Sequence, residues 1–220
     1  MDIPPIPPWP ADEAGALAEQ ERLRGLLEPG PPDAEYRLVT GVDVSYGSER
    51  LVAAAVTIDT ATMETVEEST REGTARFPYV PGLLAFRELP TLLEALAGLS
   101  GTPDLLVCDG HGLAHPRGFG LACHLGVLLG LPTIGVAKNA PWPTGEPGPK
   151  RGDTAPIERD GAVVGRVLRT QDGVKPVYVS TGHRTELDAA CRVVLALAPK
   201  HRQPETTRRS DGLSRRLLKG

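Results

Sequence analysis

The order of the strand and helix patterns is the feature that most constrains the fold of this chain. Residues 37–46 and 51–58 read as strands, and residues 62–74, where Thr and Val are frequent, read as a third. After residue 82 the pattern changes, because apolar residues spaced as in a helix alternate with short apolar runs typical of buried strands. A β-meander followed by alternating helices and strands predicts one mixed sheet with helices on both faces.

This element order predicts an α/β protein with an RNase H-like fold, in which three antiparallel strands precede two parallel strands joined by helices. We therefore expect a mixed, five-stranded central sheet. An earlier helix is expected over residues 11–28, and the Pro- and Gly-rich residues 140–152 are expected to form a long loop. The elements expected after the meander cover residues 83–98, 104–109, 119–130, 133–137, 161–169, 175–180 and 184–198.

Composition favours one globular domain with distinct ends. A chain of 220 residues, 40% of them hydrophobic, can bury a sizeable core. Five prolines predict an irregular arm over residues 1–10, the domain covers residues 11–207, and residues 208–220 read as a weakly packed basic tail. No apolar run reaches the ~18 residues of a membrane span and no secretory signal opens the chain. We therefore expect a cytoplasmic monomer that does not bind membranes.

Charge is divided unevenly along the chain. The formal net charge of −4 argues weakly against a nucleic-acid partner. However, residues 1–137 hold 8 basic and 19 acidic side chains, whereas residues 138–220 hold 16 basic and 9 acidic ones, a net charge of +7. Such a division is typical of a surface that meets a polyanion, although a solvated face with a basic tail gives the same count.

Three carboxylates lie on segments that the predicted fold brings together. Asp43 lies on a strand and faces away from its flanking valines, Asp109 ends a buried strand, and Glu88 lies on the helix after residue 82. An inward Asp on a central strand must be paired or bound to a metal. Carboxylate oxygens suit Mg²⁺ or Mn²⁺, which could activate a water and stabilise a leaving 3′ oxygen. A turn-capping Asp and a Glu88 that only pairs with Arg87 are the alternatives.

Potentially catalytic and ligand-binding residues are most concentrated in residues 109–117. This segment has two histidines, an acid, an arginine and two glycines, and it directly follows a buried strand. A histidine there could shuttle a proton or orient a water. Structural zinc competes as an interpretation, but no cysteine lies at ligand spacing. Lys138 ends the next strand and His183 lies at a strand-to-helix junction, where each could hold a phosphate. A surface lysine and a helix-capping histidine are the ordinary alternatives.

Together these motifs closely resemble the endonuclease V family of deoxyinosine-specific repair nucleases. The match covers residues 10–207 in order and spacing, which is far more specific than any single motif, and it makes residues 11–207 a catalytic domain. The matching sequences are G-V-D-V-S-Y at 41–46, P-Y-V-P-G-L-L-A-F-R-E at 78–88, D-G-H-G-L-A-H-P-R at 109–117, T-I-G-V-A-K at 133–138 and S-T-G-H-R at 180–184.

The resemblance implies an endonuclease that depends on Mg²⁺, with Mn²⁺ as the expected substitute. Such an enzyme hydrolyses the second phosphodiester bond 3′ to deoxyinosine in damaged DNA and leaves 3′-hydroxyl and 5′-phosphate ends. The resemblance assigns metal ligation to Asp43, Glu88 and Asp109. It assigns the catalytic histidine to His115 rather than His111.

The resemblance also assigns contacts to DNA. Tyr79, braced by Pro78 and Pro81, matches a wedge that holds the strands apart once the damaged base is extruded, and its ring can replace lost base stacking. Lys138 is expected near the metal site as a catalytic residue, and His183 is expected at the phosphates. Main-chain groups should line the base pocket around Gly82, Leu84, Gly110 and Gly120.

Other functions stay open at this point. An RNase H-like nuclease could instead prefer inosine-containing RNA or branched nucleic acid, and the sequence does not decide between DNA and RNA. A non-catalytic binder with a relic metal site is disfavoured, because all three carboxylates are present. A serine hydrolase built on Ser180 and His183 lacks a nucleophile elbow such as G-x-S-x-G.

Overall fold

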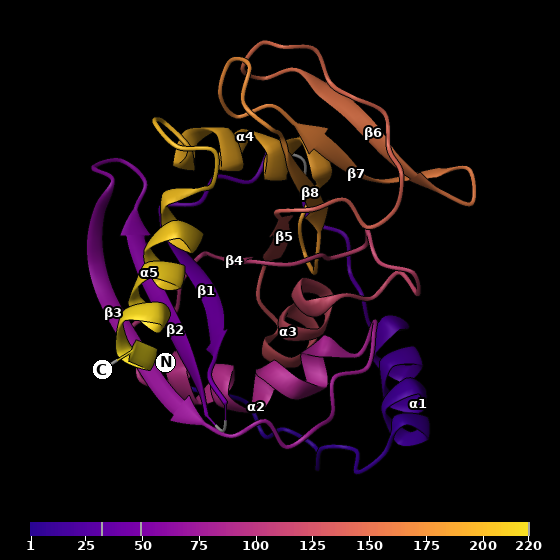
Figure 1. The fold of residues 1–220 in the computed structure, drawn as a ribbon, viewed down its shortest axis with the longest axis vertical. Helices are drawn as coiled ribbons and strands as arrows, with labels where there is room; N and C mark the ends of the chain where they lie inside the picture. The colour runs from indigo at the N-terminus through magenta and orange to yellow at the C-terminus, as the bar shows by residue number, and fades with distance from the viewer. Residues whose placement is uncertain (32, 49, 220) are drawn as a thin grey trace.

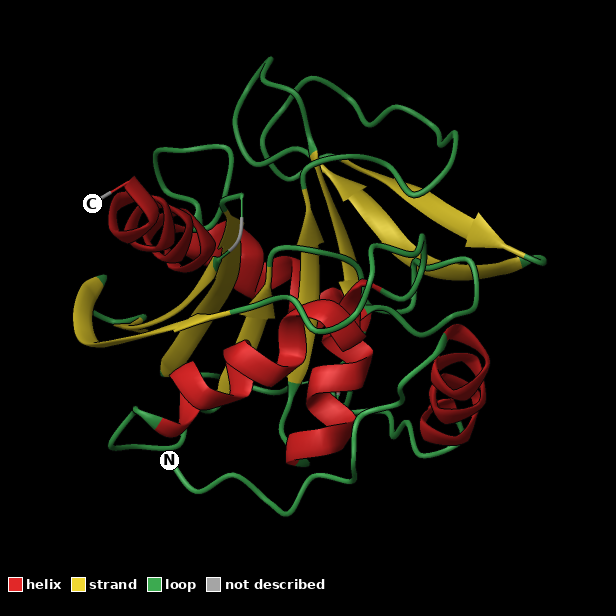
Figure 2. Cartoon of the chain, turned by 60° about the horizontal axis from the view of Figure 1, so that its bottom comes forward, coloured by secondary structure: helices red, strands yellow, loops and turns green. Residues whose placement is uncertain are grey.

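The computed structural model describes residues 1–31, 33–48 and 50–219. An eight-stranded mixed sheet in the order β3-β2-β1-β4-β5-β8-β7-β6 forms its centre, with helices packed around it (Figure 1, Figure 2). The strands are β1 Leu38–Tyr46, β2 Leu51–Asp59, β3 Glu64–Gly73, β4 Leu105–Cys108, β5 Thr133–Ala137, β6 Thr154–Arg159, β7 Ala162–Leu168 and β8 Val177–Thr181. The helices are α1 Glu13–Arg24, α2 Leu84–Ala97, α3 Leu121–Leu129, α4 Leu187–Leu197 and α5 Glu205–Lys219.

The centre of the sheet confirms the expected RNase H-like plan. β1 pairs antiparallel with β2, and β2 with β3, whereas β1, β4 and β5 run parallel to one another. The strand count was wrong: the sheet has eight strands instead of five. The difference arises because β8, β7 and β6 continue the sheet beyond β5 as an antiparallel meander.

Helices cover both faces of the sheet, as expected. On one face Leu89 of α2 and Leu125 of α3 belong to the same buried cluster as Val42 of β1. On the other face Val194 of α4 packs in a cluster with Val107 of β4, and α5 lies along β1 and β2. Because side chains alternate along β1, Asp43 points to the opposite face from Val42, which is the face that carries α5.

The C-terminal residues are not the weakly packed tail that composition predicted. Residues 208–219 belong to α5, whose inner face is buried against the sheet through Ser210, Leu213 and Ser214. The helix comes very close to β1, because a Cβ at Gly41 would lie 2.3 Å from the carbonyl carbon of Thr206. Glycine at this position is therefore what lets α5 dock. Residue 220 of the predicted tail lies outside the described residues.

The N-terminal arm is irregular, as expected, since residues 1–10 form neither helix nor strand. It is nevertheless attached to the domain, because Ile3, Ile6 and Trp9 pack against the cluster formed by α2, α3 and the sheet. Within the described part of the chain, no helix is both long and apolar enough to cross a membrane.

Candidate active site

Three aspartates from distant parts of the chain form a carboxylate cluster (Asp43, Asp109 and Asp211). Asp43 lies on β1 and Asp109 directly follows β4, and the parallel pairing of these strands aligns Val42 with Cys108 and so brings the two aspartates together. Asp211 arrives from α5. Each contributes a carboxylate oxygen within 4.8 Å of the other two. Oxygen ligands in this number suit a hard divalent cation.

Lys138, which follows β5, supplies positive charge to the cluster. Its Nζ lies 2.5 Å from Asp109 Oδ2 and 3.3 Å from Asp211 Oδ1. Burial acts to lower the pKa of Lys138, but the hydrogen bond and charge of Asp109 outweigh it and raise that pKa above its ordinary value. The ammonium group therefore stays charged, and it sits where the sequence predicted a catalytic lysine.

A pair of hydroxyl groups orients Asp43. Ser214 Oγ donates a hydrogen bond to Asp43 Oδ2 at 2.9 Å and lies 2.8 Å from Ser45 Oγ. Burial, followed by the charge of Asp109, raises the pKa of Asp43 to about 6, and the Ser214 hydrogen bond partly opposes this rise. A bound cation would favour the ionised carboxylate, so metal binding at this cluster and proton release are coupled.

Glu88 is close to the cluster but is held separately. Its side chain is buried, and its Oε1 accepts a hydrogen bond from Tyr46 at 2.8 Å. Burial raises the pKa of Glu88 to about 8, with smaller contributions from the charges of Asp43 and Asp109. Among the acidic residues that the structure describes, the set with mutually close oxygens contains Asp211 and not Glu88. Two of the three predicted ligands, Asp43 and Asp109, therefore lie in the cluster. The sequence did not predict the third member, Asp211.

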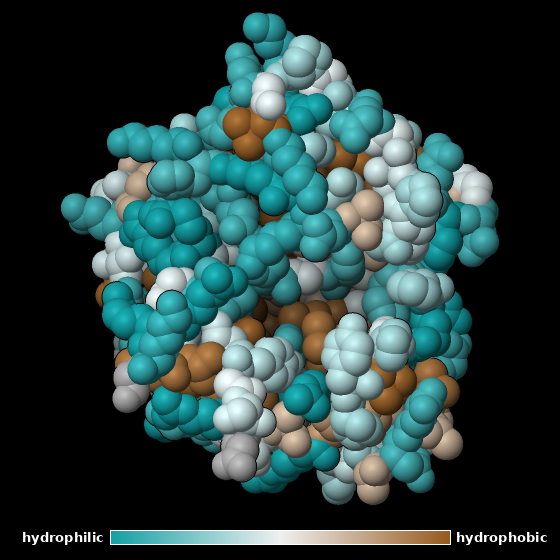
Figure 3. Space-filling view, in the orientation of Figure 1, coloured by the Kyte–Doolittle hydropathy of each residue, from teal (hydrophilic) through white to brown (hydrophobic). Residues whose placement is uncertain are grey.

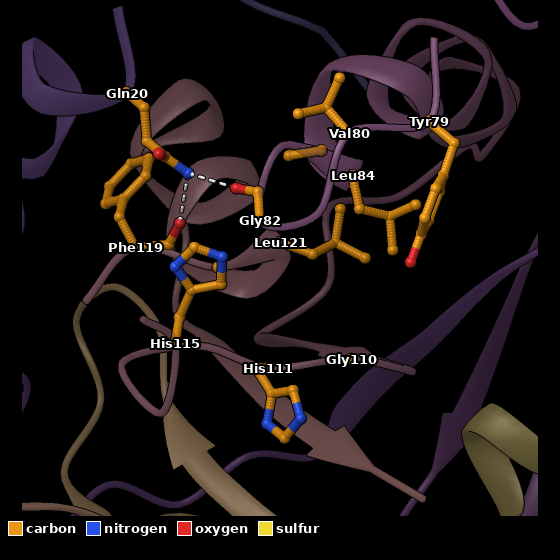
Figure 4. A pocket seen from close by; sticks show the side chains of 12 residues that line it. Gln20, Tyr79, Val80, Gly82, Leu84, Gly110, His111, His115, Phe119 and Leu121 are labelled. Atoms are coloured by element: carbon orange, nitrogen blue, oxygen red, sulfur yellow. Dashed lines mark hydrogen bonds between the residues drawn. The ribbon is translucent and has the colours of Figure 1, made fainter. Parts of the chain in front are cut away.

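A cavity of about 200 Å³ lies next to the cluster, between the N-termini of α2 and α3 (Figure 4). We call it the α2/α3 pocket. The face seen in Figure 1 is hollowed near its middle, with hydrophobic atoms in the hollow and hydrophilic atoms around it (Figure 3). All four residues predicted to form a base pocket line it, together with the predicted wedge and histidine: Gly82, Leu84, Gly110, Gly120, Tyr79 and His115.

The walls of the α2/α3 pocket are rich in backbone donors. Leu84 and Leu121 begin α2 and α3, and both residues line the pocket. Within the described residues, neither helix has a side-chain cap at its N-terminus. The first N–H groups of a helix have no intrahelical i−4 partner. Here the N–H of Ala122 donates to the His111 carbonyl and that of Phe86 to the Leu83 carbonyl. The N–H groups of Leu84 and Leu121 are therefore the donors that the helix starts can offer.

Two histidines border the α2/α3 pocket, so the structure does not choose between them. Burial lowers the pKa of His115 to about 4, and burial likewise lowers that of His111 to about 4. His115 Nδ1 accepts a hydrogen bond from the backbone N–H of Arg117 at 3.2 Å. A neutral ring whose Nδ1 accepts carries its proton on Nε2, so His115 can donate from that nitrogen.

Tyr79 stands at the rim of the α2/α3 pocket, between Pro78 and Pro81. Its side chain is 70% exposed. Figure 4 shows it across the pocket from Gln20 and Phe119. An exposed ring in a segment braced by prolines is available to stack on a base.

His183 is buried at its strand-to-helix junction. Its side chain is 3% exposed, and its Nδ1 accepts a hydrogen bond from the backbone N–H of Glu28 at 3.2 Å. This hydrogen bond joins the junction to the residues after α1, and the phosphate contact of His183 stays a prediction from the sequence. The strand-to-helix position that suggested phosphate binding is equally suited to securing the residues after α1.

A mixed RNase H-like sheet with clustered carboxylates on neighbouring strands is typical of nucleases, which hydrolyse phosphodiester bonds. Within that class the chain belongs to the Endonuclease V family, whose sequence model matches residues 22–212. The family expected from the sequence motifs is thereby confirmed.

Relatives match over nearly the whole chain. Endonuclease V from Streptomyces avermitilis is 60% identical over 217 residues, covering 96% of this chain and 94% of its own length. Its crystal structure superposes with a TM-score of 0.91 at 58% identity, covering 97% and 96% of the two chains. The catalytic domain of human Endonuclease V gives 0.87 at 36% identity, covering 94% and 95%.

A more distant relative was solved with nucleic acid. Endonuclease V from Ciona intestinalis superposes with a TM-score of 0.82 at 28% identity, covering 94% of this chain and 97% of its own. That protein is in complex with a 24mer DNA containing an inosine followed by a ribo-adenosine.

Proposed function

We propose that this endonuclease hydrolyses the second phosphodiester bond 3′ to deoxyinosine in damaged DNA, with Mg²⁺, and leaves 3′-hydroxyl and 5′-phosphate ends. One observation carries the proposal: Gly110 lines the α2/α3 pocket, while its neighbour Asp109 belongs to the carboxylate cluster. A nucleotide whose base enters the pocket would then have neighbouring backbone phosphates beside the carboxylates, and we propose that these are the phosphates on its 3′ side. The inosine-containing DNA bound by the Ciona relative supports this class of ligand.

The carboxylate cluster has the donor chemistry that a divalent cation needs. Asp43, Asp109 and Asp211 would hold the ion, and Glu88 would face it from beside Tyr46. Bound there, Mg²⁺ or its substitute Mn²⁺ would activate a water and stabilise charge on the leaving 3′ oxygen. The ammonium of Lys138 would attract the scissile phosphate to the same place.

His115 would act on the substrate as a neutral imidazole. Its lowered pKa of about 4 leaves the ring uncharged at neutral pH. The Nε2–H can donate a hydrogen bond to a substrate oxygen while Nδ1 stays engaged with Arg117. This assigns His115 to positioning the extruded nucleotide.

The α2/α3 pocket would recognise hypoxanthine through backbone donors. The N–H groups of Leu84 and Leu121, at the uncapped starts of α2 and α3, would suit the carbonyl oxygen at ring position 6, where adenine carries an amino group. Extruding a poorly paired base costs less than extruding a normally paired one. Tyr79, supported by Pro78 and Pro81, would fill the gap left in the duplex.

Cleavage of inosine-containing RNA is the second candidate function. The observation that favours it is the ribo-adenosine after the inosine in the DNA bound by the Ciona relative. A role in DNA repair, a monomeric state and a cytoplasmic location remain predictions from the sequence.

The test compares end-labelled strands carrying deoxyinosine or riboinosine, each with Mg²⁺ and with EDTA. We expect cleavage only with Mg²⁺, and the two strands separate DNA from RNA activity. Asp109→Asn should abolish cleavage and retain binding of the deoxyinosine strand measured by fluorescence anisotropy. Asp160→Asn is the matched control, because that carboxylate is 91% exposed and remote from the cluster. Wild-type cleavage by Asp109→Asn, or cleavage in EDTA, would overturn the proposal.

A further inference from the structure

Gln20 joins two walls of the α2/α3 pocket from helix α1. Its side chain is 2% exposed although it lies on a largely polar helix. Its Nε2 donates hydrogen bonds to the carbonyl oxygens of Gly82 at 3.0 Å and Phe119 at 2.9 Å (Figure 4). Its Oε1 accepts a hydrogen bond from Arg117 Nε. These partners define the orientation of the amide, because a flipped amide would place its oxygen against two carbonyl oxygens.

Arg117 completes the arrangement from the other side of Gly82. Its Nη2 donates to the Gly82 carbonyl oxygen at 2.6 Å, so this oxygen accepts two hydrogen bonds, one for each lone pair. Gly82 has a φ of +81°, and a Cβ there would lie 2.7 Å from Arg117 Nη2. Only glycine combines this backbone conformation with so close a guanidinium.

Two backbone acceptors of the pocket are therefore engaged by side chains of the protein. The carbonyls of Gly82 and Phe119 are hydrogen-bonded to protein side chains, whereas the first N–H groups of α2 and α3 have no side-chain cap among the described residues. A base with an acceptor at ring position 6 finds donors in such a pocket. A base with an amino group there leaves that group without a partner, which is costly in a buried site.

We propose that Gln20 is a positioning residue that makes the pocket select a carbonyl oxygen over an amino group at ring position 6 of the purine. This inference rests on the proposed function of the pocket. Loss of the amide would release the Phe119 carbonyl and one lone pair of the Gly82 carbonyl. Both could then accept a hydrogen from the amino group of adenine, and the two walls would lose their common tether.

The test measures selectivity, which a change in the amount of active enzyme cannot alter. Single-turnover cleavage is followed with excess enzyme and Mg²⁺ on labelled single strands that differ only in carrying deoxyinosine or deoxyadenosine. Single strands remove the contribution of base pairing. For Gln20→Leu we expect the ratio of the two rate constants to fall at least tenfold. Glu21→Ala, an exposed change on the same helix, should keep the wild-type ratio.

An unchanged ratio in folded Gln20→Leu would overturn the inference. If that variant does not fold, Gln20→Glu decides, since glutamate has the same size and can accept from Arg117 but donates to neither carbonyl. The same fall in ratio supports the inference, and a wild-type ratio overturns it. Equal cleavage of the two strands by the wild-type enzyme would overturn the proposed function itself. The two failures are therefore distinguishable.

Discussion

Ser214 Oγ of α5 donates a hydrogen bond of 2.9 Å to Asp43 Oδ2 of β1, across 171 positions of the chain. Asp211 lies three residues before Ser214, and residues at this spacing share one face of a helix. One turn of α5 therefore supplies one carboxylate of the cluster and orients another. Without this helix, the carboxylate cluster would contain only Asp43 and Asp109.

We expect Ser214→Ala to weaken Mn²⁺ binding roughly 10-fold, within the ~10–100-fold range for partners that orient metal ligands. The reason is that Asp43 loses the hydrogen bond that favours its ionised form. Isothermal titration at constant pH measures the change. Ser210→Ala is the control, since this buried hydroxyl on the same helix bonds to the Thr207 carbonyl. Equal affinities in the two variants would contradict the role given to Ser214.

Removing the positive charge of Lys138 should separate metal binding from catalysis. We expect Lys138→Met to bind Mn²⁺ at least as tightly as the wild type, because the ammonium no longer competes for Asp109 and Asp211. Cleavage at saturating Mg²⁺ should fall by ~10²–10³, the usual effect of losing one group that stabilises developing charge. Lys175→Met, which removes an exposed lysine bonded to Asn139, serves as the control. Wild-type cleavage by Lys138→Met would rule out a catalytic lysine.

The polar residues carried by the central strands could be predicted from the sequence, whereas the residues that α5 adds to the site could not. Asp43 lies within an alternating strand pattern, Asp109 and Lys138 follow apolar strand patterns, and parallel pairing brings these positions together. The inner face of α5 is instead made of small polar residues that allow a close approach to β1. The sequence of α5 therefore lacks the leucine spacing that marks a packed helix. The basic composition of residues 208–220 is instead typical of a weakly packed tail.

Two other features escaped prediction for similar reasons. Strand β6 lies at the edge of the sheet and contains Pro156, so its alternation of buried Ala155 and Ile157 with exposed residues is easily taken for a loop. Gln20 lies on a polar helix, where an amide is ordinarily exposed. Only the tertiary contact with Gly82 and Phe119 gives it a role.

The metal-free protein should lose stability as the pH rises from ~7.5 to ~8.5. Burial raises the pKa of Glu88 to about 8, whereas an unfolded Glu titrates near ~4.3. In this window the folded state holds a proton that the unfolded state has released, so the free energy of unfolding falls with pH. This contribution is fully present below pH ~4.3 and is lost as the pH passes through the folded pKa. Burial also lowers the pKa of four histidines in the folded state, namely His111, His115, His124 and His183. They titrate near ~6.5 when unfolded, so they oppose this slope around pH 6.5 and contribute little above pH ~7.5.

Melting temperatures in EDTA across this pH range check the prediction. Glu88→Gln should reduce the dependence of the melting temperature on pH. Mg²⁺ should offset the loss of stability in the wild type by binding the ionised carboxylates. An identical slope in Glu88→Gln would assign the pH dependence to another group.

Tyr79→Ala should weaken binding to an inosine duplex more than to an inosine single strand. The exposed ring would replace stacking that exists only in the duplex, and base–aromatic stacking contributes ~1–3 kcal/mol, so a loss of about tenfold is expected. Fluorescence anisotropy with Asp109→Asn as the common background measures binding without cleavage. Val66→Ala, an exposed apolar change on β3, is the control. Equal losses on both substrates would argue against a wedge.

The most direct test of the central claim maps the nick on a 5′-end-labelled duplex that contains one deoxyinosine, with Mg²⁺ and with EDTA. We predict one labelled product, which ends one nucleotide beyond the inosine in a 3′-hydroxyl and forms only with Mg²⁺. Cuts that ignore the inosine, a cut at another bond, or a cut that persists in EDTA would contradict it.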